Sequence, residues 1–245
     1  MRKALIVGGA NGIGLAIATE LAGRSDFGNI YIVDKAQPEP TLMHEKFVCS
    51  QFDLSASDFS FFDRFTDIDT LIITAGFGKL ALFKDVTEEH IVSSMTVNAT
   101  AVMRLVHHFY DKICSKEEFY CGIMVSIAGF MSSPFFAVYG ASKAALKIFI
   151  ESVNVELEKA GTDNRILNIS PGSIKGTSFN HGKTDLSQTK ALAEDILQHL
   201  YAKEDLFIPM YDEIFHDVLE RYHQDFRAEG RHSYDYKVAS GRIKP

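Results

Sequence analysis

The sequence is poor in cysteine and in positive charge, and each shortage excludes a class of function. Cys49, Cys114 and Cys121 are the only cysteines in 245 residues, and their spacing matches no metal or redox motif. We therefore expect free thiols in a reducing compartment. Acidic residues outnumber basic ones by 32 to 25, a net charge of −7. That balance argues against nucleic acid or an anionic membrane surface as a partner.

Long apolar runs, internal repeats and linkers are missing as well. No apolar run reaches the roughly 20 residues of a transmembrane helix, and the stretch before the first glycines is too short for a signal peptide. With 245 residues, the chain predicts one soluble, cytoplasmic domain, long enough to bury a full core.

Short apolar segments alternate with amphipathic ones. The expected strands are 4–7, 30–34, 46–51, 70–74, 122–126, 165–170 and a short one at 206–209. The expected helices are 13–24, 57–65, 87–114 with one break, 138–160, 191–201 and 212–227. This alternation predicts an α/β fold, a doubly wound, Rossmann-like parallel sheet in a single domain with helices on both faces. Residues 177–245 would form a substrate-side excursion and a C-terminal helix and tail.

A glycine-rich turn (residues 8–14, GGANGIG) joins the first expected strand to the first expected helix. Such a turn lets the backbone approach a pyrophosphate, whose charge the helix N-terminus stabilises. Its Gly-x-x-x-Gly-x-Gly spacing differs from the Gly-x-Gly-x-x-Gly of the long dehydrogenases.

Two acidic residues at strand ends are candidates for the adenosine half of a dinucleotide. Asp34, about 20 residues after the last glycine, could accept hydrogen bonds from the ribose and repel a 2′-phosphate. Capping of the next loop is the alternative, and Lys35 could neutralise the acid or meet a phosphate. Asp53 could reach an adenine amino group or, equally, cap the following helix. This half of the sequence favours NAD over NADP.

Tyr139 and Lys143 lie four residues apart in an expected helix, where their side chains share a face about 6 Å apart. We expect the ammonium to lower the tyrosine pKa from near 10 and so to prepare proton transfer near neutral pH. A second such pair, Tyr31 and Lys35, lies on an expected strand, where four residues span roughly 13 Å. That pair cannot act together.

In the order and spacing of these motifs, the chain resembles the short-chain dehydrogenase/reductase family, in its single-domain branch, over roughly residues 3–177. The resemblance rests on the glycine turn, Asp53, Ala75-Gly76, Asn98, Ser126, the Tyr139–Lys143 pair and Pro171-Gly172. It implies an oxidoreductase that transfers hydride between a nicotinamide cofactor, NAD more than NADP, and a carbonyl or secondary alcohol.

The resemblance also implies roles for single residues. Tyr139 would be the general acid/base, and Lys143 would bind the nicotinamide ribose. Ser126 would bind the substrate oxygen, and Asn98 would hold a water in a relay to Lys143. Taken alone, Ser126 could simply end a strand and Asn98 could bond to helix backbone. The implied cofactor-binding residues are Gly8, Asn11, Gly12, Ile13, Gly14, Asp34, Asp53, Leu54, Ala75, Gly76, Tyr139, Lys143, Pro171, Gly172, Ile174 and Thr177.

Three features depart from the family pattern. Val7 stands where a threonine is usual, and Thr74 stands in a stretch where asparagines are common. Both changes predict a less rigid cofactor site. The C-terminal third lacks the usual closing strand, which puts the family's subunit contacts and substrate lid in doubt.

The expected substrate pocket is aromatic and apolar. Its candidates are Phe77, Leu80, Phe130, Met131, Phe135, Phe136, Ser173, Ile174 and Phe179. They favour an uncharged, partly apolar carbonyl or alcohol, with core packing as the alternative for any one of them. The resemblance implies a homodimer or homotetramer, with Ala144, Ile148 and Val155 outward. We expect no metal, nucleic acid or membrane partner. The alternative function is a non-catalytic dinucleotide-binding regulator or sensor.

Overall fold

The computed structural model describes residues 1–177, 179 and 183–243. Its strands are β1 (Arg2–Val7), β2 (Phe27–Asp34), β3 (Phe47–Gln51), β4 (Thr70–Ile73), β5 (Tyr120–Met124), β6 (Ile166–Ile169) and β7 (Leu206–Phe207). They form one parallel sheet in the order β3-β2-β1-β4-β5-β6-β7. The predicted doubly wound parallel sheet is confirmed, and its order reverses between β1 and β4.

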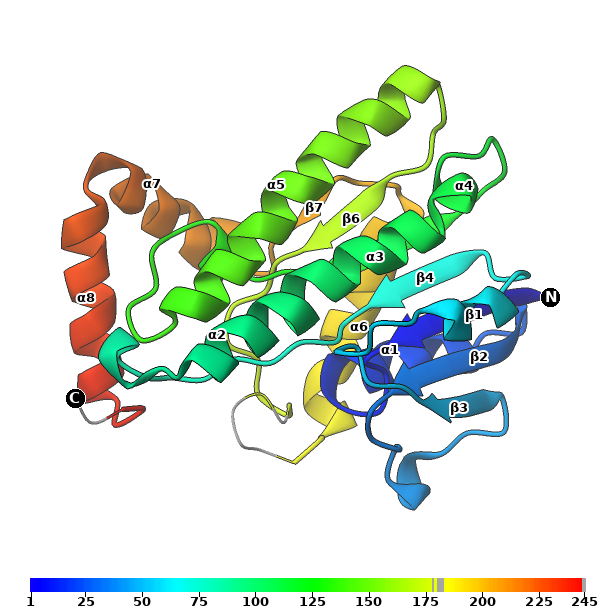
Figure 1. Cartoon of the computed structure of the whole chain (residues 1–245), viewed down its shortest axis with the longest axis horizontal. Helices are drawn as coiled ribbons and strands as arrows, with labels where there is room; N and C mark the ends of the chain where they lie inside the picture. The colour runs from blue at the N-terminus through cyan, green and yellow to red at the C-terminus, as the bar shows by residue number, and fades with distance from the viewer. Residues whose placement is uncertain (178, 180–182, 244–245) are drawn as a thin grey trace.

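Helices cover both faces of this sheet (Figure 1). They are α1 (Gly12–Ala22), α2 (Glu88–Met95), α3 (Ala101–His108), α4 (Tyr110–Ile113), α5 (Ala137–Ala160), α6 (Leu186–Tyr201), α7 (His216–Gln224) and α8 (Phe226–Ala239). One face packs on α1 and α6, and the other packs on α3 and α5. None of the helices in the described part of the chain is long and apolar enough to cross a bilayer.

The buried stretches of the central strands are mostly apolar because both of their faces are covered. In β1, Leu5 and Val7 point into one core, and Ala4 and Ile6 point into the other. Alternate residues of a strand project to opposite sides of the sheet, so a central strand needs an apolar residue at every position.

Three expected helices differ from the observed ones. The segment 57–65 forms only a 3-10 helix (Ser60–Arg64), because its phenylalanines, including Phe59 and Phe62, are drawn into the core. The segment 87–114 has the one expected break as a π-helical turn (Thr96–Thr100) between α2 and α3, and a second, unexpected break at Phe109 between α3 and α4. Helix α6 begins at Leu186, earlier than expected, because Asp185 caps it by accepting a hydrogen bond from the backbone of Ser187.

The prediction of one last helix followed by a tail is wrong. The chain forms two helices, α7 and α8, separated by Asp225, whose carboxylate accepts hydrogen bonds from the backbone N–H groups of Arg227 and Ala228 and so caps α8. Helix α8 lies beside the loop that precedes α5 (Figure 1), to which Lys237 donates hydrogen bonds. The segment 177–245, expected to form the substrate-side excursion and the tail, includes residues 178, 180–182 and 244–245, which lie outside the described residues.

Candidate active site

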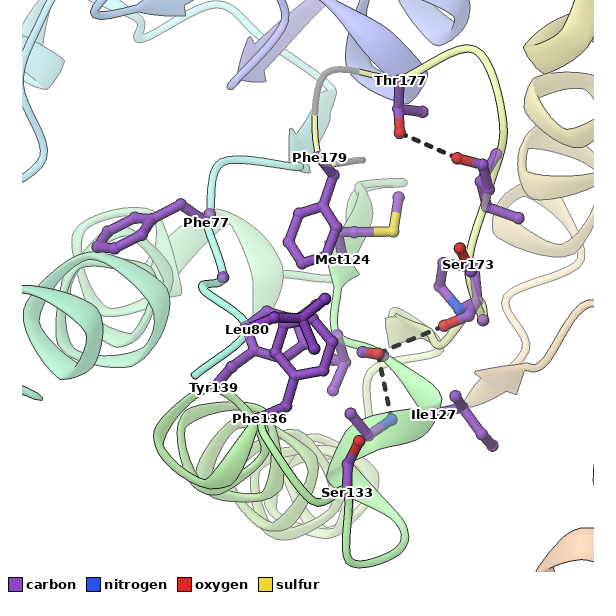
Figure 2. A pocket seen from close by; sticks show the side chains of 18 of the residues that line it. Phe77, Leu80, Met124, Ile127, Ser133, Phe136, Tyr139, Ser173, Thr177 and Phe179 are labelled. Carbon is purple, nitrogen blue, oxygen red and sulfur yellow. Dashed lines mark hydrogen bonds between the residues drawn. The ribbon is translucent and has the colours of Figure 1, made fainter. Parts of the chain in front are cut away.

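A cavity of about 560 Å³ lies at the carboxyl ends of the central strands, where the strand order reverses. In open α/β sheets this switch point is where ligands bind. The glycine turn, the ends of β4 and β5, the loop before α5, the segment after β6 and helix α8 all line the cavity. Figure 2 shows its central part.

At two positions, Gly8 and Gly14, the glycine turn lies too close to neighbouring backbone for a side chain. A Cβ atom added to Gly8, whose φ is 91°, would lie 2.3 Å from the backbone nitrogen of Ala75. One added to Gly14 would lie 2.4 Å from the carbonyl oxygen of Gly8. These two glycines are therefore required sterically, and the turn leaves its backbone open to the cavity.

Thr74 supplies the brace that Val7 cannot. Its hydroxyl donates a hydrogen bond to the carbonyl oxygen of Gly8 over 2.9 Å, while the Val7 side chain is buried in the core. The threonine that stands in place of an asparagine therefore supplies a hydroxyl near the one that Val7 lacks. It holds the glycine turn from the end of β4.

The first N–H of α1 has a partner that sequence reasoning missed. The backbone of Gly12 donates a hydrogen bond to the hydroxyl of Thr184 over 3.1 Å, and Thr177 packs against the same glycine. Thr184 is 172 residues away in the chain, inside the polar excursion, so no local signal could have identified it.

Asn98 is fully buried in the π-helical turn. Its Oδ1 accepts from the backbone N–H of Phe77 over 2.9 Å, and its Nδ2 donates to the carbonyl oxygen of Phe77 over 2.8 Å. The same Nδ2 lies 3.2 Å from the hydroxyls of Ser94 and Ser142. The side chain thus ties the chain after β4 to α2 and α5.

Lys143 lies next to this network on α5 and is 2% exposed. Its ammonium donates a hydrogen bond to the carbonyl oxygen of Met124 at the end of β5 over 2.8 Å. A Cβ atom on Gly76 would lie 3.2 Å from Asn98 Oδ1 and 3.4 Å from Lys143 Nζ. Gly76 therefore gives the lysine room beside the chain that leaves β4.

Ser126 and Tyr139 both line the cavity. The Ser126 hydroxyl accepts from the backbone N–H of Ala128 over 3.1 Å and lies 3.4 Å from the carbonyl oxygen of Pro171. The Tyr139 ring lies 5.3 Å, centroid to centroid, from the ring of Phe136 and equally far from that of Phe179. Figure 2 shows these rings forming an aromatic wall.

The expected lowering of the Tyr139 pKa is wrong for this structure. Burial raises the pKa of Tyr139 to about 12, and the Ser126 hydroxyl beside it acts in the opposite direction. Burial also lowers the pKa of Lys143 to about 8. The Lys143 Nζ atom lies 5.7 Å from the centre of the Tyr139 ring, so the helical spacing is as expected. The sequence could not reveal the desolvation that outweighs it.

The two acidic candidates lie outside the cavity lining, at the ends of β2 and β3. Asp34 accepts hydrogen bonds from the backbone N–H groups of Ala10 and Ala36, each over 3.1 Å, which holds its carboxylate beside the glycine turn. Asp53 is exposed, and its pKa is lowered chiefly by a hydrogen bond from the backbone of Ser55. The neighbouring Leu54 side chain packs into the core.

Most of the expected pocket residues line the cavity. Those that do are Phe77, Leu80, Met131, Phe136, Ser173, Ile174 and Phe179. Phe135 is buried against Tyr234 instead, and Phe130 packs against a small core that includes Ile208. Sequence reasoning missed the wall that helix α8 contributes, and with it Glu229, Ser233 and Lys237.

The residues present fit a nicotinamide dinucleotide. The cavity is continuous from the glycine turn to Tyr139 and includes Asn11, Gly12, Ile13, Pro171, Gly172, Ile174 and Thr177. Gly8, Gly12 and Gly14 line this cavity, so a pyrophosphate could approach the backbone at the start of α1.

Known sequences agree with this geometry. The family described as short chain dehydrogenase matches residues 2–188. The chain belongs to that family. As a member, it is an oxidoreductase that uses a nicotinamide cofactor.

Two curated relatives show how similar in sequence this short-chain dehydrogenase is to other members of the family. The chain is 32% identical over 146 residues to the short-chain dehydrogenase srdE of Neurospora crassa, a match that covers 56% of the chain and 48% of that relative. It is 28% identical over 198 residues to the 3-oxoacyl-[acyl-carrier-protein] reductase MabA of Mycobacterium avium, a match that covers 80% of the chain and 72% of that relative.

Solved structures share the fold. A short-chain dehydrogenase from Sphingobium yanoikuyae in complex with NADPH has a TM-score of 0.73 at 22% identity, covering 93% of this chain and 95% of that one. One from Burkholderia phymatum in complex with NAD has a TM-score of 0.76 at 16% identity, with the same coverage.

The brace from Thr74 generates a prediction about cofactor binding. Thr74→Val leaves the Gly8 carbonyl without its hydroxyl donor, at a cost of about 1 kcal/mol. We expect the Kd for NADH, measured by fluorescence titration, to rise about fivefold. Thr74→Ser keeps the hydroxyl and is the matched control. Equal Kd values for Thr74→Val and wild type would contradict the brace.

The buried ammonium of Lys143 generates a prediction about stability. Its pKa is about 8 in the folded chain against 10.5 as a reference, so between these values the unfolded state binds more protons. Wild-type stability should therefore rise with pH relative to Lys143→Met, by roughly 3 kcal/mol in total. Urea unfolding at about pH 7 and about pH 10.5 measures this difference. Lys237 is present in both proteins, so its titration cancels in the comparison. If the difference in unfolding free energy between wild type and Lys143→Met did not change with pH, the lowered pKa of Lys143 would be refuted.

Proposed function

We propose that this short-chain dehydrogenase transfers hydride between NAD(H) and a carbonyl or secondary alcohol, with Tyr139 as the general acid/base. The observation that carries the proposal is the placement of Ser126 and Tyr139 on one cavity, with the buried ammonium of Lys143 behind them. A bound nicotinamide ring supplies or accepts the hydride.

The roles of the protein groups follow from their environments. A pKa of about 12 keeps Tyr139 protonated at neutral pH, so it is ready to donate a proton to a carbonyl oxygen. The Ser126 hydroxyl can donate a hydrogen bond to the same oxygen and stabilise the charge that develops on it. Lys143 places a positive charge beside the phenol and favours the phenolate that is left.

The cofactor preference is proposed from Asp34. Its carboxylate is held beside the glycine turn by two backbone N–H groups, where it can accept hydrogen bonds from ribose hydroxyls and would repel a 2′-phosphate. Lys35 is exposed and makes a small contribution to the lowering of the Asp53 pKa. Asp53 and Leu54 are proposed for the adenine.

The aromatic wall supports an uncharged, partly apolar reacting end of the substrate. The rings of Phe136 and Phe179 lie beside Tyr139 (Figure 2), and Phe77 and Leu80 add apolar lining to the same cavity. Such surfaces favour a ketone or alcohol with an apolar body over one with a charge next to the carbonyl. Residues 177–245 would form the substrate side of the domain.

We also propose a cytoplasmic homo-oligomer. The outward positions Ile148 and Val155 of α5 are 59% and 57% exposed, which supports packing against a second copy, and Cys49, Cys114 and Cys121 are free thiols. A monomeric mass in sedimentation equilibrium would contradict the assembly, and recovery outside the cytoplasmic fraction of cells would contradict the location.

Replacing the proton donor tests the mechanism. Tyr139→Phe should lower kcat on any accepted ketone by about a hundredfold or more while NADH still binds. Tyr31→Phe is the matched control, because Tyr31 belongs to the other Tyr-x-x-x-Lys pair and lies on β2. Unchanged turnover in Tyr139→Phe would overturn the mechanism. NADH binding without turnover by the wild type on a broad carbonyl panel would favour a non-catalytic sensor.

Competing titrations test the cofactor. We expect NADH to bind about tenfold or more tightly than NADPH, because a 2′-phosphate would face the Asp34 carboxylate. Asp34→Ser should narrow that ratio, whereas Asp26→Ser, next to the opposite end of β2, should leave it as it is. Tighter binding of NADPH by the wild type would refute the NAD proposal.

A further inference from the structure

Helix α8 turns a polar face towards the cavity. The cavity-lining residues of α8 are Glu229, His232, Ser233, Tyr236 and Lys237, at the three- and four-residue spacing that places side chains on one face of a helix. A helix normally packs its apolar face inward. The substrate cavity therefore has one aromatic wall near Tyr139 and one polar wall where α8 meets the loop that precedes α5.

Lys237 is the centre of this polar wall and is 7% exposed. Its ammonium donates to the hydroxyl of Ser133 and the carbonyl oxygen of Pro134, each over 2.8 Å, and to the hydroxyl of Ser233 over 3.2 Å. All three acceptors are neutral, and no carboxylate pairs with this ammonium among the described residues. Burying a charge that lacks a counter-ion is costly, which points to a ligand of opposite charge.

The hydroxyls of two serines, Ser133 and Ser233, link the Lys237 ammonium to the cavity and can donate hydrogen bonds to a ligand there. Ser133 and Ser233 both line the cavity, and Figure 2 shows Ser133 on the same loop as Phe136. Each hydroxyl accepts its hydrogen bond from Lys237, so its own proton is available to a further acceptor. Neither donates to an acceptor in the described part of the chain. Together they offer two O–H donors polarised by one cation.

The other charged groups on this wall leave it positive. Glu229 is balanced by Arg221, whose Nε donates to its Oε2 over 2.8 Å, and His232 lies 3.6 Å from its other oxygen. Arg242 also lines the cavity and adds positive charge. Burial, and to a smaller extent the charge of Arg242, lowers the pKa of Lys237 to about 8. An anion is the ligand that such a surface favours.

We propose that Ser133 and Ser233, held by Lys237, form a subsite that binds a carboxylate on the substrate, at the end remote from the reacting carbonyl. This rests on the proposed function and narrows the substrate to an oxo acid or hydroxy acid with an apolar middle. The ring of Phe136 lies 5.7 Å from Lys237 Nζ and 5.3 Å from the Tyr139 ring, so the apolar middle would lie along it. Such a substrate would carry a charge that the uncharged substrate expected from the sequence lacks.

The test compares acids with their neutral analogues. A graded series of oxo acids, with increasing numbers of methylenes between carbonyl and carboxylate, is assayed with NADH beside the methyl ester of each. At the chain length that fits, we expect the wild type to prefer the acid in kcat/KM. Ser133→Ala and Ser233→Ala should each lower the acid-to-ester ratio by about tenfold or more, as loss of a charge-assisted hydrogen bond does.

Ser132→Ala is the matched control. Ser132 adjoins Ser133 but neither lines the cavity nor bonds to Lys237, so the acid-to-ester ratio should stay at the wild-type value. Circular dichroism shows whether each variant is folded. Turnover of the esters with no preference for any acid, or a ratio that the two subsite serines do not affect, would overturn the subsite and leave the proposed function standing.

A binding measurement separates the two proposals if no ketone is reduced. Calorimetric titration with hexanoate and with hexanamide compares a carboxylate with its neutral isostere on the intact protein. The subsite predicts tighter binding of hexanoate to the wild type and loss of that preference in the Ser133→Ala, Ser233→Ala double variant. Equal binding of the two probes would refute the subsite whatever the activity.

Discussion

The buried amide of Asn98 is the interaction on which the rest of the site depends. It pairs with both the N–H and the carbonyl of Phe77 and reaches the hydroxyls of Ser94 and Ser142. The chain after β4, helix α2 and helix α5 are thus fixed to one another at a single side chain. Lys143 follows Ser142 directly, so the same bonds set the position of the lysine. A buried network of this kind is rigid only while every member is satisfied.

This arrangement removes Lys143 and Tyr139 from water, and their burial shifts both pKa values. Lys143 is buried, and the acceptor for its ammonium among the described residues is the carbonyl oxygen of Met124. Tyr139 lies among aromatic rings at the cavity wall. Both groups are pushed towards their neutral forms, because burial penalises a charge of either sign. The Tyr139 phenol is therefore protonated at neutral pH, which is the state that the proposed role of proton donor requires.

The sequence predicted the parts of this architecture that local patterns encode. Near-continuous apolar runs such as 4–7 indicated central strands of a covered sheet. The glycines of the turn marked the junction between the first strand and the first helix. The spacing of Tyr139 and Lys143 gave their shared face. It could not give their pKa values, because burial is a property of the whole fold.

What the sequence missed depends on contacts between distant segments. The hydroxyl of Thr74 replaces the one that Val7 lacks, but only the pairing of β1 with β4 brings it to Gly8. Helix α8 was expected to be a tail, yet its residues Glu229, Ser233 and Lys237 line the cavity. Their polar face turns inward instead, and no apolar periodicity marks it.

The most direct measurement is the fate of the hydride. The protein is incubated with NADH carrying deuterium on the transferred position of nicotinamide C4 and with a ketone or oxo acid that it reduces. Mass spectrometry then locates the label in the alcohol. Direct transfer in the Tyr139 site predicts one deuterium on the carbinol carbon and an unlabelled hydroxyl in ordinary water. An alcohol without deuterium on that carbon would contradict hydride transfer and the role of every residue assigned to it.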